Sequence, residues 1–416
     1  MSFARAAAAR ALREIGLDAA GARATLGAAP PPFETLFGFP PRNAQAQVAA
    51  LPCAAPGSVT ILESETGSGK TEAALYRFLR LFAAGLVDGL TFALPTRTAA
   101  TQIHTRVVQA IAHAFADPTT RPPVILAVPG YLAVDEVEGR RLAGFEVLWN
   151  DDDQERLRYR GWAAEHPKRY LAGPVVVATV DQVLLSALEV SHAHMRAASL
   201  SRQLLVVDEV HASDAYMIRL LEEVLRRHLG AGGQAFLMSA TLGSTARCVL
   251  ERPGSREAPS LDEAVAEAYP VVRHSGGGVA CVIPVTRGPD REVTVERVGL
   301  MDDSVGVAAL AVAAAAQGAR VIVLRNTVRG CLDTQRAVEE QAAGQWQLYL
   351  ATTDNYFYPI SAATEPETPP GPCDRLRPPQ CSTSRGHTTG ATAPTCATLR
   401  TPRQCRHSYP PMCPIR

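Results

Sequence analysis

Two acidic residues and a histidine follow a short apolar run near the middle of the chain, and their types suit phosphate chemistry. The run 204–207 is followed by Asp208, Glu209 and His211. An apolar run of this length, rich in valine, is typical of a buried parallel strand, and such strands carry ligand sites at their carboxyl ends. There, one carboxylate can hold Mg²⁺ while its neighbour orients an attacking water. For an Asp-Glu pair taken alone, the alternative is a solvated strand end.

A glycine-rich loop lies upstream, between a strand-like run and a helix-like run. The loop reads Ser64-Glu65-Thr66-Gly67-Ser68-Gly69-Lys70-Thr71. A strand, a glycine loop and a helix in this order predict a phosphate-binding loop, in which backbone N–H groups from Thr66 to Gly69 surround a phosphate. We expect Lys70 to reach the β- and γ-phosphates and the Thr71 hydroxyl to bind Mg²⁺. Ser64 replaces the glycine of the strict pattern, so an ordinary turn before a helix is the alternative.

Composition limits the possible partners. The chain has 416 residues, enough for two or three domains, and its 41 basic and 41 acidic residues balance. Any nucleic-acid contact must therefore come from a local groove. Lysine occurs only at Lys70 and Lys168, and a compact ammonium at position 70 suits a phosphate site. The N-terminus lacks a strong apolar core and the apolar run 305–324 is interrupted, so we expect a cytoplasmic protein without a membrane partner.

Apolar runs alternate with helix-like stretches, which predicts an α/β fold with a parallel sheet. The expected strands of the first part of the chain are 59–62, 90–94, 124–128, 175–178, 204–207 and 235–238. A second α/β segment should contain a helix at 305–316 and strands at 292–298 and 321–324. The N-terminal residues to about 30 form a helical preface, and the composition changes from about residue 351 onward.

Several short segments occur in an order that resembles a known family. They are 63–75 around the glycine loop, Ala93-Leu94-Pro95-Thr96-Arg97, Ala178-Thr179-Val180-Asp181-Gln182, Asp208-Glu209-Val210-His211, Ser239-Ala240-Thr241-Leu242 and Arg325-Asn326-Thr327-Val328. As an ordered set they resemble the motifs of the DEVH-box helicases of type I CRISPR interference, superfamily 2 motors that unwind and degrade invading DNA. Segment 39–45 is similar to the adenine-reading element of such motors, with Gln45 as the base contact.

This resemblance implies roles for the residues that match. Asp208 and Thr71 would hold Mg²⁺, and Glu209 would position the attacking water of ATP hydrolysis. The donors that would contact phosphates of single-stranded DNA are Thr96, Arg97 and Thr179. Ser239, Thr241 and His211 would link the nucleotide to the nucleic acid. A guide-RNA surveillance complex of the CRISPR system is the implied recruiting partner.

The implied architecture is a P-loop RecA-like lobe followed by an incomplete second one. We expect a helical preface at 1–35, the first RecA-like, ATP-binding lobe at 36–255, a partial second RecA-like lobe at 256–345 and a non-native-looking or disordered tail at 346–416. The family often carries a nuclease with paired His-Asp ligands, but no His-Asp dipeptide occurs in this chain. We therefore expect a separate metal-dependent nuclease and no DNA cleavage by this chain alone.

The second lobe also lacks an expected arginine. No Gln-Arg-x-Gly-Arg segment follows Arg325, although such an arginine stabilises charge at the γ-phosphate. The tail instead contains five of the nine cysteines, at irregular spacings that disfavour a zinc site. A native disordered tail is one interpretation. A change of reading frame between about residues 335 and 360 is the preferred one.

Three other functions remain open at this stage. A DEAD/DEAH-type RNA helicase would use the same chemistry on another nucleic acid. A nucleotide- or DNA-binding remnant without turnover would follow from the missing arginine motif. An unrelated P-loop ATPase would leave the segments 178–182 and 239–241 unexplained.

Overall fold

The computed structural model describes most of the chain. The described residues are 2–14, 17–53, 57–141, 147–149, 162–210, 214–255, 259–276, 279–286, 293–342, 348–351 and 357–360. They divide into a first compact unit that extends to Val307 and a second that begins at Ala308. None of the described helices combines the length and the apolar character needed to cross a bilayer.

Six parallel strands form the centre of the sheet in the first unit, in the order β1-β9-β8-β2-β7-β3. Their bounds are Ser58–Glu63 (β1), Gly89–Leu94 (β2), Val124–Ala127 (β3), Val175–Thr179 (β7), Gln203–Val207 (β8) and Gln234–Ser239 (β9). Five of them cover a predicted run completely and β3 covers its run except for Val128, so the predicted α/β fold with a parallel sheet is confirmed.

Antiparallel strands extend this sheet at both ends. Beside β1 lie β10 (Val271–Gly276) and β11 (Val279–Pro284), and beyond β3 lie β4 (Ala133–Val134), β5 (Val137–Arg141) and β6 (Val147–Trp149). The strands β10 and β11 follow the predicted lobe boundary at residue 255, yet they continue the sheet of the first unit. The predicted domain limits stay a prediction.

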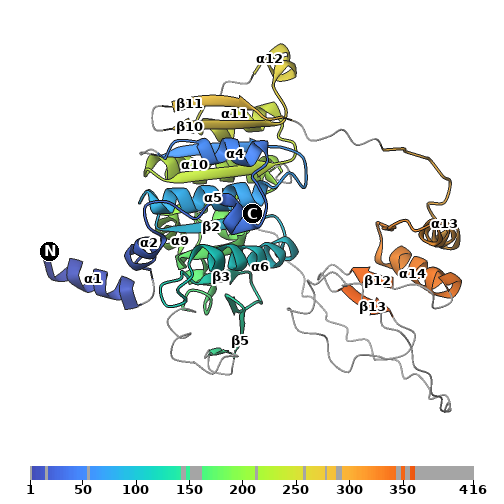
Figure 1. Ribbon diagram of the computed structural model, residues 1–416, viewed down its shortest axis with the longest axis horizontal. Helices are drawn as coiled ribbons and strands as arrows, with labels where there is room; N and C mark the ends of the chain where they lie inside the picture. The colour runs from blue at the N-terminus through green and yellow to red at the C-terminus, as the bar shows by residue number, and fades with distance from the viewer. Residues whose placement is uncertain are drawn as a thin grey trace, which may run out of the picture. The chain divides into compact units, whose positions relative to one another are not determined.

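Helices cover both faces of the sheet (Figure 1). Alternate residues of β8 show why positions 204–207 are all apolar: Leu204 and Val206 belong to one core, and Leu205 and Val207 to the other. The first core includes α2 (Ala20–Leu26), α3 (Phe33–Phe37), α4 (Asn43–Ala50), α5 (Lys70–Ala83) and α6 (Arg97–Ala114). The second includes η1 (Pro167–Ala172), α8 (Val180–Leu184), α9 (Ala193–Leu200), α10 (Ala215–Gly230) and α11 (Ser244–Glu251).

The described part of the chain also contains four further helices and one antiparallel pair of strands. They are α1 (Ser2–Glu14), α12 (Leu261–Ala266), α13 (Ser304–Ala316), α14 (Val328–Ala342) and the antiparallel pair β12 (Leu348–Ala351) and β13 (Phe357–Ile360). The helices α1 and α2 lie in the region predicted as a helical preface, and α13 confirms the predicted helix at 305–316. Within the predicted tail at 346–416 the structure describes only the strands β12 and β13, and the other residues of the tail lie outside the described residues.

Two strands predicted in the second α/β segment are wrong. Residues 293–298 and 321–324 form no strand in the described structure, while residue 292 lies outside it. Ile322 and Leu324 are 82% and 83% exposed. A strand requires a neighbouring strand to satisfy its backbone N–H and C=O groups. The apolar character of these segments predicted strands, but no described strand pairs with them.

Candidate functional site

The carboxyl ends of the central strands place five predicted site segments along one edge of the sheet. In spatial order, Ser64 follows β1, Ser239 ends β9, Asp208 follows β8, Thr96 follows β2 and Thr179 ends β7. Parallel strands all present their carboxyl ends at the same edge, which is where open α/β sheets bind ligands. The predicted nucleotide segment and the predicted nucleic-acid segments therefore flank the acidic pair.

The predicted phosphate-binding loop, residues 64–71, called the phosphate-binding loop below, joins β1 to α5 and is shaped by two glycines. Gly67 and Gly69 have φ values of 81° and 90°, in the left-handed region that glycine adopts without strain. The Lys70 side chain crosses the loop, and its Nζ donates to the carbonyl oxygens of Ser64 (2.8 Å) and Glu65 (3.2 Å). Burial lowers the pKa of Lys70, partly offset by the carboxylates of the acidic pair. A buried ammonium close to acids suits a phosphate-contacting role.

The acidic pair lies directly after β8. The Asp208 N–H donates to the carbonyl oxygen of Ala93 at 2.9 Å, which ties the pair to β2. The Glu209 N–H donates to Oδ1 of Asp208 at 2.9 Å, and Glu209 has a left-handed φ of 53°. Burial, together with the Glu209 carboxylate, raises the pKa of Asp208 to about 6; the Glu209 N–H, Lys70 and Arg106 lower it. The site would favour a cation beside Asp208.

Gln45 contacts the phosphate-binding loop from α4. Its side chain is buried, its Oε1 accepts from the Arg42 N–H at 2.8 Å, and its Nε2 donates to the Gly69 carbonyl oxygen at 3.1 Å. A Cβ atom at Gly69 would overlap the Gln45 amide. The Arg42 guanidinium donates to the Gly67 carbonyl oxygen at 2.6 Å. Gln45 therefore lies beside the loop, as its predicted role at a nucleotide requires.

Arg106 is a site residue that the sequence did not reveal. It lies in α6, its Nη1 donates to the Thr71 hydroxyl oxygen at 3.4 Å, and its other terminal nitrogen pairs with Glu72. No spacing pattern connects Arg106 to the loop at 64–71, because only packing of α6 against the sheet brings them together. The Thr71 hydroxyl and the Asp208 carboxylate are both oxygen donors, which is the ligand type that Mg²⁺ prefers.

The predicted nucleic-acid residues differ in exposure. Thr96 and Arg97 are exposed at the start of α6, where the Thr96 hydroxyl oxygen accepts from the Ala99 N–H at 3.1 Å. Thr179 is buried at the end of β7. Ser239 is also buried, and its hydroxyl donates to the Thr241 carbonyl oxygen at 2.8 Å, while Thr241 itself is exposed. The exposed pair Thr96–Arg97 is thus best placed to meet a bound strand, and the predicted residue His211 lies outside the described residues.

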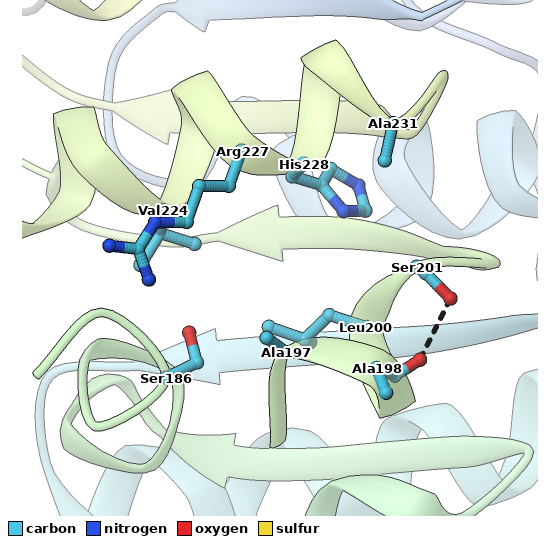
Figure 2. A pocket seen from close by; sticks show the side chains of 9 residues that line it. All are labelled: Ser186, Ala197, Ala198, Leu200, Ser201, Val224, Arg227, His228 and Ala231. Atoms are coloured by element: carbon cyan, nitrogen blue, oxygen red, sulfur yellow. Dashed lines mark hydrogen bonds between the residues drawn. The ribbon is translucent and has the colours of Figure 1, made fainter. Parts of the chain in front are cut away.

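A cavity of about 280 Å³ lies away from this edge (Figure 2). Its lining residues are Ser186, Ala197, Ala198, Leu200, Ser201, Val224, Arg227, His228 and Ala231. Leu200 and Ser201 lie two to three residues before β8, and Ala231 lies between α10 and β9. The cavity is therefore near the amino ends of these strands, opposite the edge that carries the acidic pair, and it has no part in the chemistry proposed below.

Comparisons with known proteins find CRISPR-associated proteins among those similar to this chain. No protein-family model matches the chain. A CRISPR-associated endonuclease/helicase Cas3 of Escherichia coli (strain K12) is 38% identical over 210 residues, which cover 49% of this chain and 22% of the relative. A CRISPR-associated endonuclease/helicase Cas3 of Thermus thermophilus is 32% identical over 319 residues, which cover 74% of this chain and 33% of the relative. This chain is similar to the Cas3 helicase-nucleases.

The fold agrees with this similarity. A crystal structure of T. fusca Cas3-ATP matches with a TM-score of 0.56 and 26% identity over 79% of this chain and 38% of the solved chain. A crystal structure of a CRISPR-associated protein matches with a TM-score of 0.52 and 25% identity over 74% of this chain and 35% of that one. The predicted resemblance and the RecA-like fold are thus confirmed. The matches span between 22% and 33% of the length of these Cas3 relatives.

Proposed function

We propose that this chain is the ATP-dependent motor part of a type I CRISPR interference system, acting on single-stranded DNA. The observation that carries the proposal is the placement of Lys70 beside Asp208 and Glu209, with the exposed Thr96–Arg97 turn on the neighbouring strand β2. The residues that we propose for a nucleotide and those that we propose for a nucleic-acid backbone thus lie along one sheet edge. The Cas3 similarity supports the CRISPR context.

The residues at this edge divide the work. Lys70 would neutralise the β- and γ-phosphates, and Gln45 would contact the adenine beside the loop. Thr71 and Asp208 would hold Mg²⁺, which neutralises charge that develops on the phosphates. Glu209, one residue beyond Asp208, would orient the attacking water. The buried carboxylates and the buried lysine act in a site of low polarity, where their electrostatic effect is larger than in water.

Partners follow from the same proposal. One of the similar solved structures is a pre-nicking CRISPR RNA-guided surveillance complex. We propose that such a complex delivers the displaced strand to this chain in the cytoplasm. DNA cleavage is assigned to a separate metal-dependent nuclease. A nuclease assay with purified chain, Mg²⁺ and single-stranded DNA should show no cleavage, and clear cleavage would overturn this assignment.

Phosphate release with saturating single-stranded DNA, RNA or neither tests the central proposal. Stimulation by DNA supports it, stimulation by RNA alone would identify an RNA helicase instead, and absence of turnover would favour a nucleotide-binding remnant. The variant Glu209→Gln should lose turnover by about 100-fold or more while still binding Mg-ATP, because it removes the group that orients water and keeps the phosphate contacts. Lys70→Ala should lose nucleotide binding itself.

A further inference from the structure

Five charges of alternating sign form a continuous cluster beside the phosphate-binding loop. Arg247 Nε lies 2.5 Å from Glu63 Oε1, and the same guanidinium pairs with Glu267. Arg273 then lies 3.0 Å from Glu267 and 3.7 Å from Glu251. Glu63 and Arg247 are the most buried members, with side chains 4% and 10% exposed. The proposed function uses none of these five residues.

The Glu63–Arg247 pair holds the backbone of the turn that follows β9. The Leu242 N–H donates to Glu63 Oε2 at 3.3 Å, and Arg247 Nη2 donates to the Leu242 carbonyl oxygen at 2.9 Å. The backbone N–H and C=O groups of Leu242 are thus both hydrogen-bonded to the Glu63–Arg247 ion pair. Leu242 directly follows Thr241 and lies three residues after Ser239. The Glu63–Arg247 pair therefore fixes the turn that contains both hydroxyls predicted to link the nucleotide to the nucleic acid.

The same pair also touches the phosphate-binding loop. Glu63 ends β1 and faces Ser239 in the parallel ladder between β1 and β9. The next residue, Ser64, donates its N–H to the Ser239 carbonyl oxygen at 3.2 Å and accepts from Lys70 Nζ through its own carbonyl oxygen. A shift of the loop at Ser64 therefore acts directly on Glu63, and through Glu63 on Leu242.

Stability alone does not account for such a pair. The desolvation penalty of two buried charges is about as large as the electrostatic attraction between them. Apolar side chains of similar volume therefore usually stabilise a core equally well. A bidentate guanidinium instead fixes geometry. We infer that Glu63 and Arg247 are positioning residues that transmit the nucleotide state of the phosphate-binding loop to the 239–242 turn, and so make single-stranded DNA affinity depend on bound nucleotide. This inference rests on the proposed function.

The test measures that dependence directly. Fluorescence anisotropy gives the dissociation constant of a fluorescein-labelled oligodeoxythymidine for the full chain, with and without saturating Mg-AMPPNP. We expect the unaltered chain to show a ratio of about tenfold, within the usual range for coupled sites. Arg247→Gln should bring the ratio close to one while the affinity for Mg-AMPPNP stays within about twofold, because the ratio is a property of the link between the two sites.

Two further variants make the result decisive. The double variant Glu63→Gln/Arg247→Gln leaves neither member of the pair as an unpaired buried charge, so it should fold and still lack the coupling. Arg226→Gln is the matched control, since Arg226 is an exposed arginine paired with Glu223, and it should keep the full ratio. Retained coupling in the double variant would overturn the inference, as would loss of nucleotide affinity together with coupling in both Arg247 variants. If bound nucleotide does not change the DNA affinity of the unaltered chain, the proposed function fails together with the inference. If only the variants keep the coupling, the inference alone fails.

Discussion

Asp208 and Glu209 follow a single buried strand, and burial together with the neighbouring Glu209 carboxylate makes the carboxyl of Asp208 unusually easy to protonate. Burial and the Glu209 carboxylate raise the pKa of Asp208 to about 6. The folded state therefore binds this proton more tightly than the unfolded state does, and the associated stability is lost as pH rises towards 6. A cation at Asp208 requires the deprotonated form, so its affinity changes in the opposite sense.

The first prediction concerns this titration. Mg-nucleotide affinity at pH 5 should be about tenfold weaker than at pH 7.5, because about nine-tenths of Asp208 carboxyls with a pKa of about 6 are protonated at pH 5. Isothermal titration with Mg-ADP across this range measures it. Asp208→Asn serves as the control for protonation of the nucleotide itself. An equal pH dependence in the variant would show that Asp208 does not hold the metal.

A second prediction at the residue scale concerns Arg97, which is exposed at the start of α6. If it neutralises one phosphate of a bound strand, Arg97→Ala should reduce the slope of log affinity against log salt concentration by about 0.7. Anisotropy titrations of single-stranded DNA at several salt concentrations give this slope. The exposed, ion-paired Arg226 is the comparison, and an equal effect of Arg226→Ala would mean that only overall charge is being measured.

At the scale of elements, the join between α4 and the phosphate-binding loop can be tested separately from the loop itself. Gly67 and Gly69 both have left-handed backbones, but only at Gly69 would a Cβ atom overlap the Gln45 amide. Each alanine substitution should cost about 1–2 kcal/mol of unfolding free energy through backbone strain. Gly69→Ala should cost about 1 kcal/mol more, because it displaces the Gln45 hydrogen bond.

A double-mutant cycle isolates this extra term. In a Gln45→Ala background, Gly69→Ala and Gly67→Ala should have equal effects in urea unfolding, since the clashing amide is gone. If Gly69→Ala still costs more unfolding free energy than Gly67→Ala in this background, the steric clash must involve another group than the Gln45 amide.

The elements also show what the sequence could predict. The six central strands were predictable because a parallel strand covered on both faces contains a run of consecutive apolar residues, as at 204–207 of β8. The segment 321–324 has the same apolar character but no described strand beside it, and a single chain segment does not contain that information. Arg106 and Arg247 were missed for a related reason: their partners Thr71 and Glu63 lie in segments far away in the sequence.

At the scale of the whole molecule, ligand binding should appear as increased stability. A ligand present at 100 times its dissociation constant stabilises a folded protein by about 2.7 kcal/mol if it does not bind the unfolded chain. Mg-ATP should therefore raise the melting temperature of the full chain by several degrees, and Lys70→Ala should abolish the shift. Differential scanning fluorimetry measures both proteins, and a shift of equal size in the variant would place the nucleotide away from the 64–71 loop.

The positive φ of Glu209 has a consequence for how this site balances two demands. A left-handed backbone is costly for any residue with a Cβ atom, and the Glu209 carboxylate also repels that of Asp208. Glu209→Gly removes both costs. The free energy of unfolding of this inactive variant should therefore be about 1 kcal/mol larger at pH 7, and the variant should unfold at a higher urea concentration than the active protein. Urea titrations of the two proteins decide the matter, and a less stable glycine variant would contradict it. If variants at position 209 were selected for stability alone, those without the carboxylate would be favoured. Selection for ATP turnover would be needed to retain Glu209.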